Sequence, residues 1–189
     1  GVDNALNLIK YAGYLLGQEA SWKEPAPLLK AGLYWPLLQY PRLEELQESW
    51  VSGNKIALIT FYRALVTSGN LKPIDALIKI LLEQGINPLP VYVSSLKDQH
   101  SDEFIKEVTL KLDISVVLNT TAFAVSSTES PAKTGPFRNT DCPVFQLILS
   151  SSEKDTWLAS PTGLSPRDIA MNVALPEVDG RLISRAVSF

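Results

Sequence analysis

Two carboxylates stand two residues apart near the end of the sequence, in the segment Pro-Glu-Val-Asp-Gly that runs from Pro176 to Gly180. Carboxylate oxygens bind hard divalent cations, and a carboxylate can also accept a proton as a general base. If the chain is extended here, alternation places Glu177 and Asp179 on one side and Val178 on the other. The alternative interpretation is a surface turn, because proline and glycine flank the pair.

A predicted helix precedes this acidic segment. Ser165 is a favourable N-cap, Pro166 suits the first helical turn, and Asp168 stands three residues after the cap. Pro176 has no N–H and disfavours helical geometry at Leu175, so we expect the helix to end there. The two carboxylates would then follow the end of the helix directly.

Other side chains with reactive chemistry are scarce. His100 is the single histidine and Cys142 the single cysteine, so neither a usual zinc site nor a Cys-x-x-Cys motif is expected. Ser-His-Asp hydrolysis would have to depend on His100 alone, among polar neighbours. We expect Cys142 to be a small residue near the core, in a protein from a reducing compartment.

The composition limits the class of protein. With 189 residues and 46% hydrophobic residues, the chain suits one domain plus an appendage. A net charge of -3 disfavours nucleic acid as a partner, since phosphate binding depends on Lys and Arg. No apolar run approaches the roughly 20 residues of a membrane span, and no signal peptide is recognisable, so we expect a cytoplasmic protein. The absence of an initial methionine suggests a section of a longer polypeptide.

The order of apolar runs predicts an α/β fold. From residue 55, four short strand-like runs (55–62, 88–95, 114–121 and 143–150) alternate with helical segments (73–85, 102–112 and 151–160) or loops. This pattern predicts a doubly wound, mainly parallel sheet of about four to five strands, in a flavodoxin-like three-layer sandwich. Residues 1–50 are predicted as a helical or irregular N-terminal segment and 51–189 as the α/β domain. Residues 126–140, rich in Ser, Thr, Pro and Gly, are predicted as a long mobile loop.

Open α/β sheets bind ligands at the carboxyl ends of their strands. We therefore expect one crevice lined by the strand ends, at Tyr62, Arg63, Asn119, Thr120 and Ser150. Arg63 would be a carboxylate clamp there, or alternatively a solvated residue beside a helix cap. Neither common nucleotide-binding glycine motif is present, so the chain is not expected to hydrolyse ATP by itself.

Three blocks of the sequence resemble the family of large subunits of aerobic cobaltochelatase (CobN), which is related to the porphyrin-binding large subunit of magnesium chelatase. They are residues 61–98, beginning FYRALVTSGN, then VVLNTTAFA at 116–124, and GLSPRDIAMNVALPEVDGRLISRAVSF at 163–189. The resemblance extends from about Lys55 to Phe189, with weaker likeness before it. It implies that the sequence is an internal fragment of a chain several times longer.

The resemblance implies a role in an ATP-dependent, multi-subunit metal chelatase. The substrates would be Co²⁺ and the corrinoid ring hydrogenobyrinic acid a,c-diamide, while AAA+-type partner subunits would use the ATP. The acidic segment of the family maps onto residues 176–180, which implies a catalytic or metal-handling role for Glu177 first and Asp179 second. Where the family has a histidine in a Tyr-His-Pro turn, this chain has Trp35.

Two alternatives remain open on the sequence. The first is a magnesium chelatase large subunit that inserts Mg²⁺ into protoporphyrin IX, although the ending SRAVSF resembles the cobalt enzymes more closely. The second is a flavodoxin-like domain that is not catalytic and only binds a ligand or joins parts of a larger subunit. In either chelatase, oxygen ligands suit the task, since thiolates would bind the metal too tightly for release.

Overall fold

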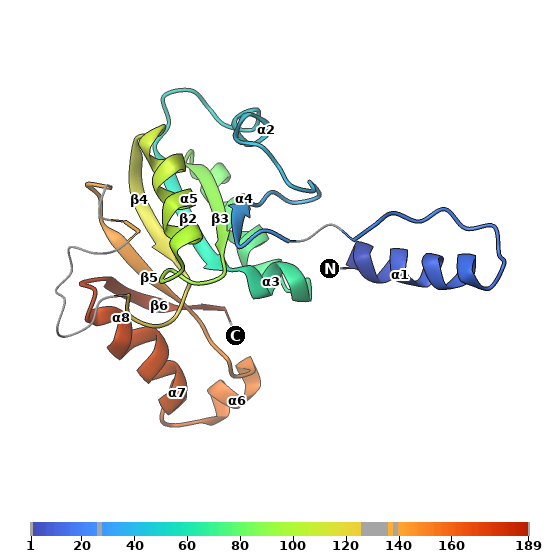
Figure 1. Cartoon of the computed structure of the whole chain (residues 1–189). Helices are drawn as coiled ribbons and strands as arrows, with labels where there is room; N and C mark the ends of the chain where they lie inside the picture. Colours follow the sequence, from blue (N-terminus) through green and yellow to red (C-terminus); the bar gives the residue numbers. More distant parts are fainter. Residues whose placement is uncertain (1, 26–27, 126–135, 138–139, 189) are drawn as a thin grey trace.

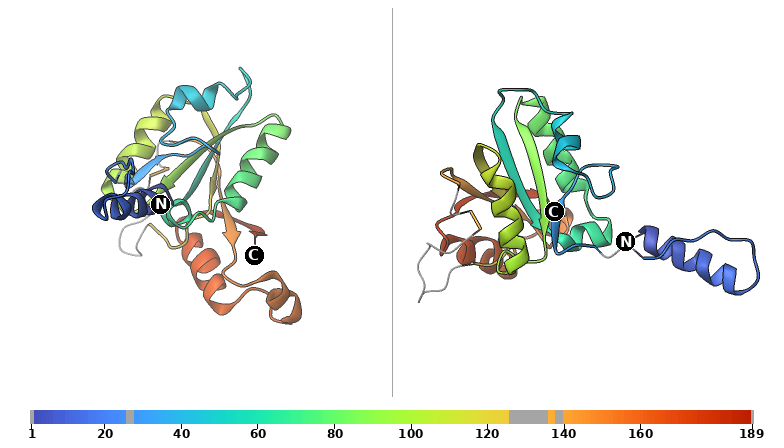
Figure 2. Two further views of the ribbon diagram at one scale, coloured as in Figure 1. Left: turned by 90° about the vertical axis from the view of Figure 1, so that its right-hand side faces the viewer. Right: turned by 45° about the horizontal axis from the view of Figure 1, so that its top comes forward.

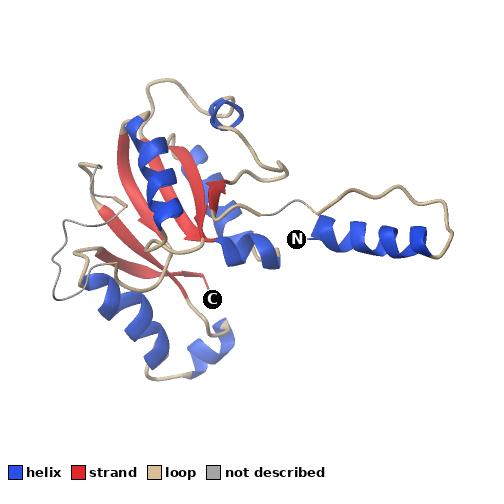
Figure 3. Cartoon of the chain, in the orientation of Figure 1, coloured by secondary structure: helices blue, strands red, loops and turns tan. Residues whose placement is uncertain are grey.

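The computed structural model of the chain describes residues 2–25, 28–125, 136–137 and 140–188. Its centre is one sheet with helices packed on both faces (Figures 1 and 3). The strands are β1 (Ala31–Leu33), β2 (Ile56–Tyr62), β3 (Asn87–Val93), β4 (Ile114–Asn119), β5 (Val144–Leu149) and β6 (Leu182–Ser188). The helices are α1 (Val2–Leu15), α2 (Leu43–Gln47), α3 (Arg63–Ser68), α4 (Lys72–Glu83), α5 (Gln99–Leu110), α6 (Lys154–Ala159), α7 (Pro166–Ile169), the π-helical turn η1 (Ala170–Ala174) and α8 (Leu175–Glu177).

The strand order of the sheet is β1-β3-β2-β4-β5-β6. Neighbouring strands from β3 to β6 are parallel, and β1 pairs antiparallel with β3 at one edge. Without β1 this is the flavodoxin-like order, in which the chain first winds to one side of its starting strand and then to the other. The predicted doubly wound, mainly parallel fold is therefore confirmed. The order reverses between β2 and β4.

The sheet has six strands, whereas the sequence predicts four to five. The four predicted runs correspond to β2–β5, so β6 and β1 have no counterpart among them, and β1 lies in the proline-rich N-terminal segment. Gly32 in β1 is the register partner of Tyr92 in β3. A Cβ atom on Gly32 would stand 2.5 Å from the Tyr92 hydroxyl oxygen. Glycine therefore permits this close pairing. The predicted boundary after residue 50 stays a prediction, but Ala31, Leu33 and Leu46 are buried in a core that they share with the sheet.

Alternate residues of the central strand β2 face two separate apolar cores. Leu58 packs in one core with Ile105 of α5. Ile59 and Phe61 pack in the other core with Ile74 of α4. Because side chains alternate along a strand, α4 and α5 cover opposite faces of the sheet, as Figure 1 shows. All five side chains are fully buried, and each contributes about 1.5–3 kcal/mol through burial.

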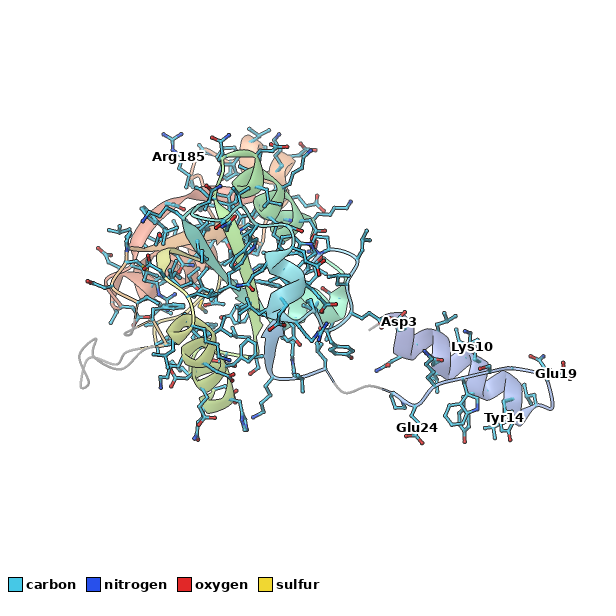
Figure 4. The ribbon with its side chains drawn as sticks, turned by 90° about the horizontal axis from the view of Figure 1, so that it is seen from above. Asp3, Lys10, Tyr14, Glu19, Glu24 and Arg185 are labelled. Carbon is cyan, nitrogen blue, oxygen red and sulfur yellow. The ribbon has the colours of Figure 1, made fainter. Side chains whose placement is uncertain are left out.

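The N-terminal segment forms an arm that projects from the α/β body (Figure 2). The arm consists of α1 and an extended return, and Figure 4 shows Tyr14 and Glu19 on it, far from Arg185. Tyr11 packs edge-on against Trp22, with 4.6 Å between the ring centroids, and so joins the two halves of the arm. The predicted helical lead-in is confirmed. Several large apolar side chains of the arm are exposed, namely Leu6, Leu8, Ile9, Leu15 and Leu16.

Two further expectations from the sequence concern loops and membrane spans. The predicted mobile loop at residues 126–140 lies mostly outside the described residues.

Within the part of the chain that the structure describes, no helix combines the length and the apolar character that are needed to cross a membrane. The exposed apolar residues of the arm lie in α1, which has 14 residues and is shorter than a bilayer requires, or directly after it at Leu16.

Candidate functional site

The helix that leads to the two carboxylates does not end where the sequence predicts. It begins as expected at Ser165, whose side chain accepts the Asp168 N–H. It then continues through η1 and α8 as far as Glu177, and Val178 also has helical backbone angles. The expectation that Pro176 ends the helix is therefore wrong. Because the following residues are not extended, the two carboxylates do not alternate along one side of a strand.

The π-helical turn explains how a proline fits within this helix. The Leu175 N–H bonds to the carbonyl of Ala170, five residues back, rather than to the carbonyl of Met171. Pro176 has no N–H, so neither Leu175 nor Pro176 donates to Met171. Instead the Phe123 N–H donates to the Met171 oxygen at 3.1 Å. The proline thus leaves a carbonyl available for the loop that follows β4.

Asp179 forms a buried ion pair with Arg181 just before β6. Arg181 Nη2 donates to Asp179 Oδ2 at 2.7 Å. The Arg181 side chain is 2% exposed and the Asp179 side chain is 10% exposed. The same oxygen accepts the Val125 N–H at 2.8 Å. Gly180 between them has a φ of 70°, which permits the tight turn. Burial lowers the pKa of Arg181, and the charge of Asp179 opposes that shift.

A row of buried polar side chains continues from Arg181 across the sheet. Arg181 and Asn119 both donate to Gln146 Oε1, at 2.9 and 2.7 Å. Thr60 donates to Asn119 Oδ1 at 2.7 Å. Thr60, Asn119 and Gln146 are register partners on β2, β4 and β5, and each is fully buried. A buried network whose members are all hydrogen-bonded fixes the register of these strands.

Glu177 differs from Asp179 because its side chain is exposed, at the last turn of the helix. An exposed carboxylate can accept a proton or meet a metal ion from outside the domain. The described residues contain no group of three or more His, Cys, Asp or Glu side chains that could hold a metal ion together. The catalytic and metal-binding roles of Glu177 and Asp179 stay predictions.

A cleft of about 790 Å³ opens at the carboxyl ends of the parallel strands. Its walls come from the ends of β2, β5 and β6, from the loop after β4, and from the first turns of α4 and α7. This position is the switch in strand order, where open α/β sheets bind ligands. The structure therefore has a cleft where the sequence predicts a crevice.

The structure brings together three of the five residues predicted for the crevice, since Tyr62, Thr120 and Ser150 line the cleft. Thr120 is fixed there because its hydroxyl donates to the Thr60 carbonyl at 3.0 Å. The Tyr62 hydroxyl donates to the Ala122 carbonyl at 2.9 Å. Burial raises the pKa of Tyr62, so this phenol is a neutral hydrogen-bonding group at physiological pH.

The other two predicted residues do not line the cleft. Asn119 is fully buried, where it links Thr60 to Gln146 in the polar row. Arg63 is the first residue of α3, and its charge acts on the phenol of Tyr92 on β3. The ligand-binding roles of all five residues stay predictions, but the geometry favours Tyr62, Thr120 and Ser150 over Arg63 and Asn119.

Asp168 is a cleft residue that the sequence indicates only as part of a helix start. Its carboxylate is almost fully buried and accepts hydrogen bonds from the hydroxyls of Ser150, Ser151 and Ser165, at 3.1, 3.0 and 3.0 Å. Burial raises the pKa of Asp168, but the bonds from Ser151 and the other two serines outweigh it and lower the pKa below its usual value. The ionised carboxylate fastens the loop after β5 to the start of α7.

The cleft is lined by the first part of the helix, from Arg167 to Asn172, and the acidic segment follows at the other end of that helix. Arg167 and Asp168 line the cleft from the first turn, whereas Glu177 is in the last turn. Along the helix axis Glu177 is roughly 15 Å from Arg167 and roughly 7.5 Å from Asn172, which also lines the cleft. The predicted binding residues and the predicted catalytic acid therefore do not surround a single point.

The single histidine and the single cysteine contribute nothing to the lining of the cleft. His100 is exposed on α5. Cys142 is half-buried against the apolar core, as expected, and burial raises the pKa of its thiol. A thiol with a raised pKa is a poor nucleophile, which disfavours Cys142 in that role.

Comparison with known families gives a match along the whole chain. The family described as CobN/Magnesium Chelatase matches residues 1–189. The chain belongs to this family. The resemblance that the sequence shows from Lys55 onward is therefore confirmed. The family match also extends over the N-terminal arm.

Two relatives of the CobN type are similar to this chain along its full length. The aerobic cobaltochelatase subunit CobN of Sinorhizobium sp is 43% identical over 198 residues, and that of Pseudomonas aeruginosa is 37% identical over 190 residues. Both matches cover 100% of this chain, but only 16% and 15% of the two relatives. The chain thus spans about a sixth of the length of these CobN relatives.

A solved structure supports the same assignment to the CobN/magnesium chelatase family. It is described as the catalytic subunit of cobaltochelatase from Mycobacterium tuberculosis, and it is 25% identical to this chain with a TM-score of 0.75. The match covers 98% of this chain and 15% of the mycobacterial one. The arrangement of the described elements is therefore that of one section of a much larger subunit.

Proposed function

We propose that this chain is a section of the tetrapyrrole-binding large subunit of an ATP-dependent cobaltochelatase. The proposed reaction is the insertion of Co²⁺ into hydrogenobyrinic acid a,c-diamide, the corrinoid precursor of cobalamin. One observation carries the proposal, which is the 43% identity to an aerobic cobaltochelatase subunit over the entire chain. The absence of a phosphate-binding glycine motif from the sequence supports the assignment of ATP use to AAA+-type partner subunits.

Metal insertion places two demands on the protein. The ring must lose its inner N–H protons, and Co²⁺ must exchange its bound water for ring nitrogens. A carboxylate serves both, because it accepts protons and is an exchangeable oxygen ligand. Glu177 is proposed as this group, since its carboxylate is exposed in the last turn of the helix. From there it can meet a ring that other parts of the complete subunit help to bind.

Asp179 is proposed to support this chemistry from a fixed position. Its Oδ2 atom accepts hydrogen bonds from both Arg181 and Val125. These contacts anchor the turn that follows Glu177 to the sheet and to the loop after β4. Because its carboxylate is already engaged in these contacts, Asp179 ranks second to Glu177 for metal handling.

Two other functions are distinguishable by experiment. A magnesium chelatase would insert Mg²⁺ into protoporphyrin IX, and the family description names magnesium chelatase beside CobN. A flavodoxin-like module without catalysis is favoured by a separate observation, namely the cleft at the switch between β2 and β4. Such a module would bind a flavin or another planar ligand and insert no metal.

The test uses the full-length subunit that contains this chain, together with its ATPase partners and ATP. Insertion is followed by the absorbance change of the ring, with either Co²⁺ and hydrogenobyrinic acid a,c-diamide or Mg²⁺ and protoporphyrin IX. The proposal predicts insertion with the first pair only. Insertion with the second pair alone would establish the magnesium alternative, and flavin binding without any insertion would support the module.

A further inference from the structure

The loop after β4 holds an aromatic residue in an unusual conformation at the cleft. Phe123 has a φ of 69°, in the left-handed region that residues other than glycine rarely adopt. Its side chain is nevertheless 50% exposed, and it lines the cleft. The strained backbone therefore carries a ring that gains little packing within the domain. Strain that is retained at a cleft is characteristic of ligand contacts.

Hydrogen bonds on both sides of Phe123 maintain this conformation. Its own N–H donates to the Met171 carbonyl that the proline-containing helix leaves available. The preceding carbonyl, of Ala122, accepts the Tyr62 hydroxyl. Two residues further on, the Val125 N–H bonds to Asp179. The loop is thus attached to β2, to η1 and to the acidic turn, and the ring of Phe123 stays at the cleft.

Two cationic side chains line the same cleft. Lys72 lies in the first turn of α4 and Arg167 in the first turn of α7, and both are exposed. Neither takes part in the ion pairs found among the described residues. The acidic side chain in the lining, Asp168, already accepts hydrogen bonds from three serines. The cleft therefore offers positive charge to anionic groups of a ligand.

Carboxylates suit this cleft better than phosphates. Phosphate sites are typically built from the backbone N–H groups of a helix start after a glycine-rich loop. Here β2 passes directly into α3 at Arg63, and Pro73 removes one N–H from the first turn of α4. The anion contacts that remain are side-chain cations, which bind carboxylates well. Leu65 and Met171 add apolar surface to the same lining.

We propose that this cleft binds the periphery of the tetrapyrrole, with Phe123 stacked on the conjugated ring and Lys72 and Arg167 bound to its carboxylate side chains. This inference rests on the proposed function, because it takes the tetrapyrrole as the ligand. Glu177 lies roughly 7.5 Å along the helix axis beyond Asn172, the cleft residue of this helix that is nearest to it in sequence, and it does not line the cleft itself. The subsite therefore orients the substrate by its edge and takes no part in binding the metal.

The first experiment tests the charged contacts in the full-length subunit. Binding of hydrogenobyrinic acid a,c-diamide, and of the same compound with its remaining carboxylates methylated, is measured by spectroscopic titration. The Lys72→Gln/Arg167→Gln double variant should bind the free acid about tenfold or more weakly, and the ester as the unchanged protein does. Lys79→Gln is the matched control, since Lys79 is an exposed cation on the same helix that does not line the cleft.

The second experiment tests the stacking residue. Phe123→Gly removes the ring and also the backbone strain, so the thermal unfolding temperature should not fall. The affinity for both the acid and the ester should fall roughly fivefold or more, because stacking does not depend on the carboxylates. Phe123→Tyr keeps an aromatic ring and should retain the affinity.

The outcomes separate this inference from the proposed function. Equal affinity of the unchanged protein and the double variant for the free acid would overturn the subsite and leave the proposed function intact. Failure of the unchanged full-length subunit to bind the tetrapyrrole would instead refute the proposed function, and the subsite with it. Binding of inorganic phosphate or flavin mononucleotide that weakens in the double variant, with unchanged tetrapyrrole binding, would assign the cleft to a phosphate ligand and overturn the inference.

Discussion

Arg181 donates to Asp179 at 2.7 Å across the turn that precedes β6, and both side chains are buried. This ion pair ends the row of polar side chains that crosses the sheet from Thr60, and it fastens the loop after β4 through Val125. The acidic segment thus contains one carboxylate that the fold requires and one, Glu177, that is exposed. Two acids that look alike in the sequence have different surroundings and therefore different expected roles.

Substitution of the buried acid should cost stability, whereas substitution of the exposed acid should not. Asp179→Asn leaves the buried Arg181 without its anionic partner, so we expect the free energy of unfolding to fall by about 3–5 kcal/mol. Glu177→Gln should change it by no more than about 0.5 kcal/mol, because its side chain is exposed. Urea unfolding followed by circular dichroism measures both. Equal losses for the two variants would contradict the assignment of Asp179 to the buried ion pair.

Asp168 should make the domain sensitive to acid. Its pKa in the folded state is lowered, so its carboxylate contributes stability above the unfolded-state pKa of about 3.9 and loses that contribution as the pH falls through the lower folded-state pKa. The unchanged protein should therefore lose stability below about pH 4 more steeply than Asp168→Asn. Urea midpoints measured from pH 7 downward test this, and parallel curves for the two proteins would refute it.

Pro176 should control the loop that carries Phe123. Pro176→Ala restores an N–H within the helix, where it competes for the Met171 carbonyl that now accepts the Phe123 N–H. We expect faster amide hydrogen exchange at Phe123 while the amides of β2 and β4 are unaffected. Unchanged protection at Phe123, measured by nuclear magnetic resonance, would show that the proline does not determine this contact.

Gly32 should be necessary for the edge strand β1. A Cβ atom at this position would stand 2.5 Å from the Tyr92 hydroxyl, so Gly32→Ala should cost about 1–3 kcal/mol through displacement of the Tyr92 ring. Gly13→Ala is the matched control, because its Cβ atom would meet only the end of the flexible Gln18 side chain. A Gly32→Ala variant as stable as the control would contradict the close pairing of β1 with β3.

The parallel sheet was predictable because each of its central strands is a continuous apolar run. The predicted strand 55–62 corresponds to β2 at Ile56–Tyr62, and the crevice follows from the parallel arrangement. Strand β1 was not predictable, since three residues with a central glycine become a strand only through pairing with β3. Likewise, the Met171 carbonyl that the proline-containing helix leaves unused is bonded by Phe123, which is distant in sequence.

The residues that line the cleft show the same limit. Ser150 follows an apolar strand, so its position at the cleft could be predicted from the sequence. Lys72, Arg167 and Asp168 come from helix starts, and they meet at the cleft only after the sheet is assembled. Sequence patterns describe local geometry well, but they do not indicate which helix starts become neighbours. The ion pair of Asp179 and Arg181 had a local signal, namely opposite charges on either side of a glycine.

The most direct test of the chelatase proposal is the insertion rate of Glu177→Gln in the full-length subunit, with partner subunits, ATP, Co²⁺ and hydrogenobyrinic acid a,c-diamide. Glu153→Gln serves as the control, because Glu153 is also exposed but precedes α6. The account predicts near-normal binding of the ring and an insertion rate lower by a factor of about 10²–10⁴, the usual contribution of a general base. A Glu177→Gln subunit that inserts cobalt as fast as the control would contradict it.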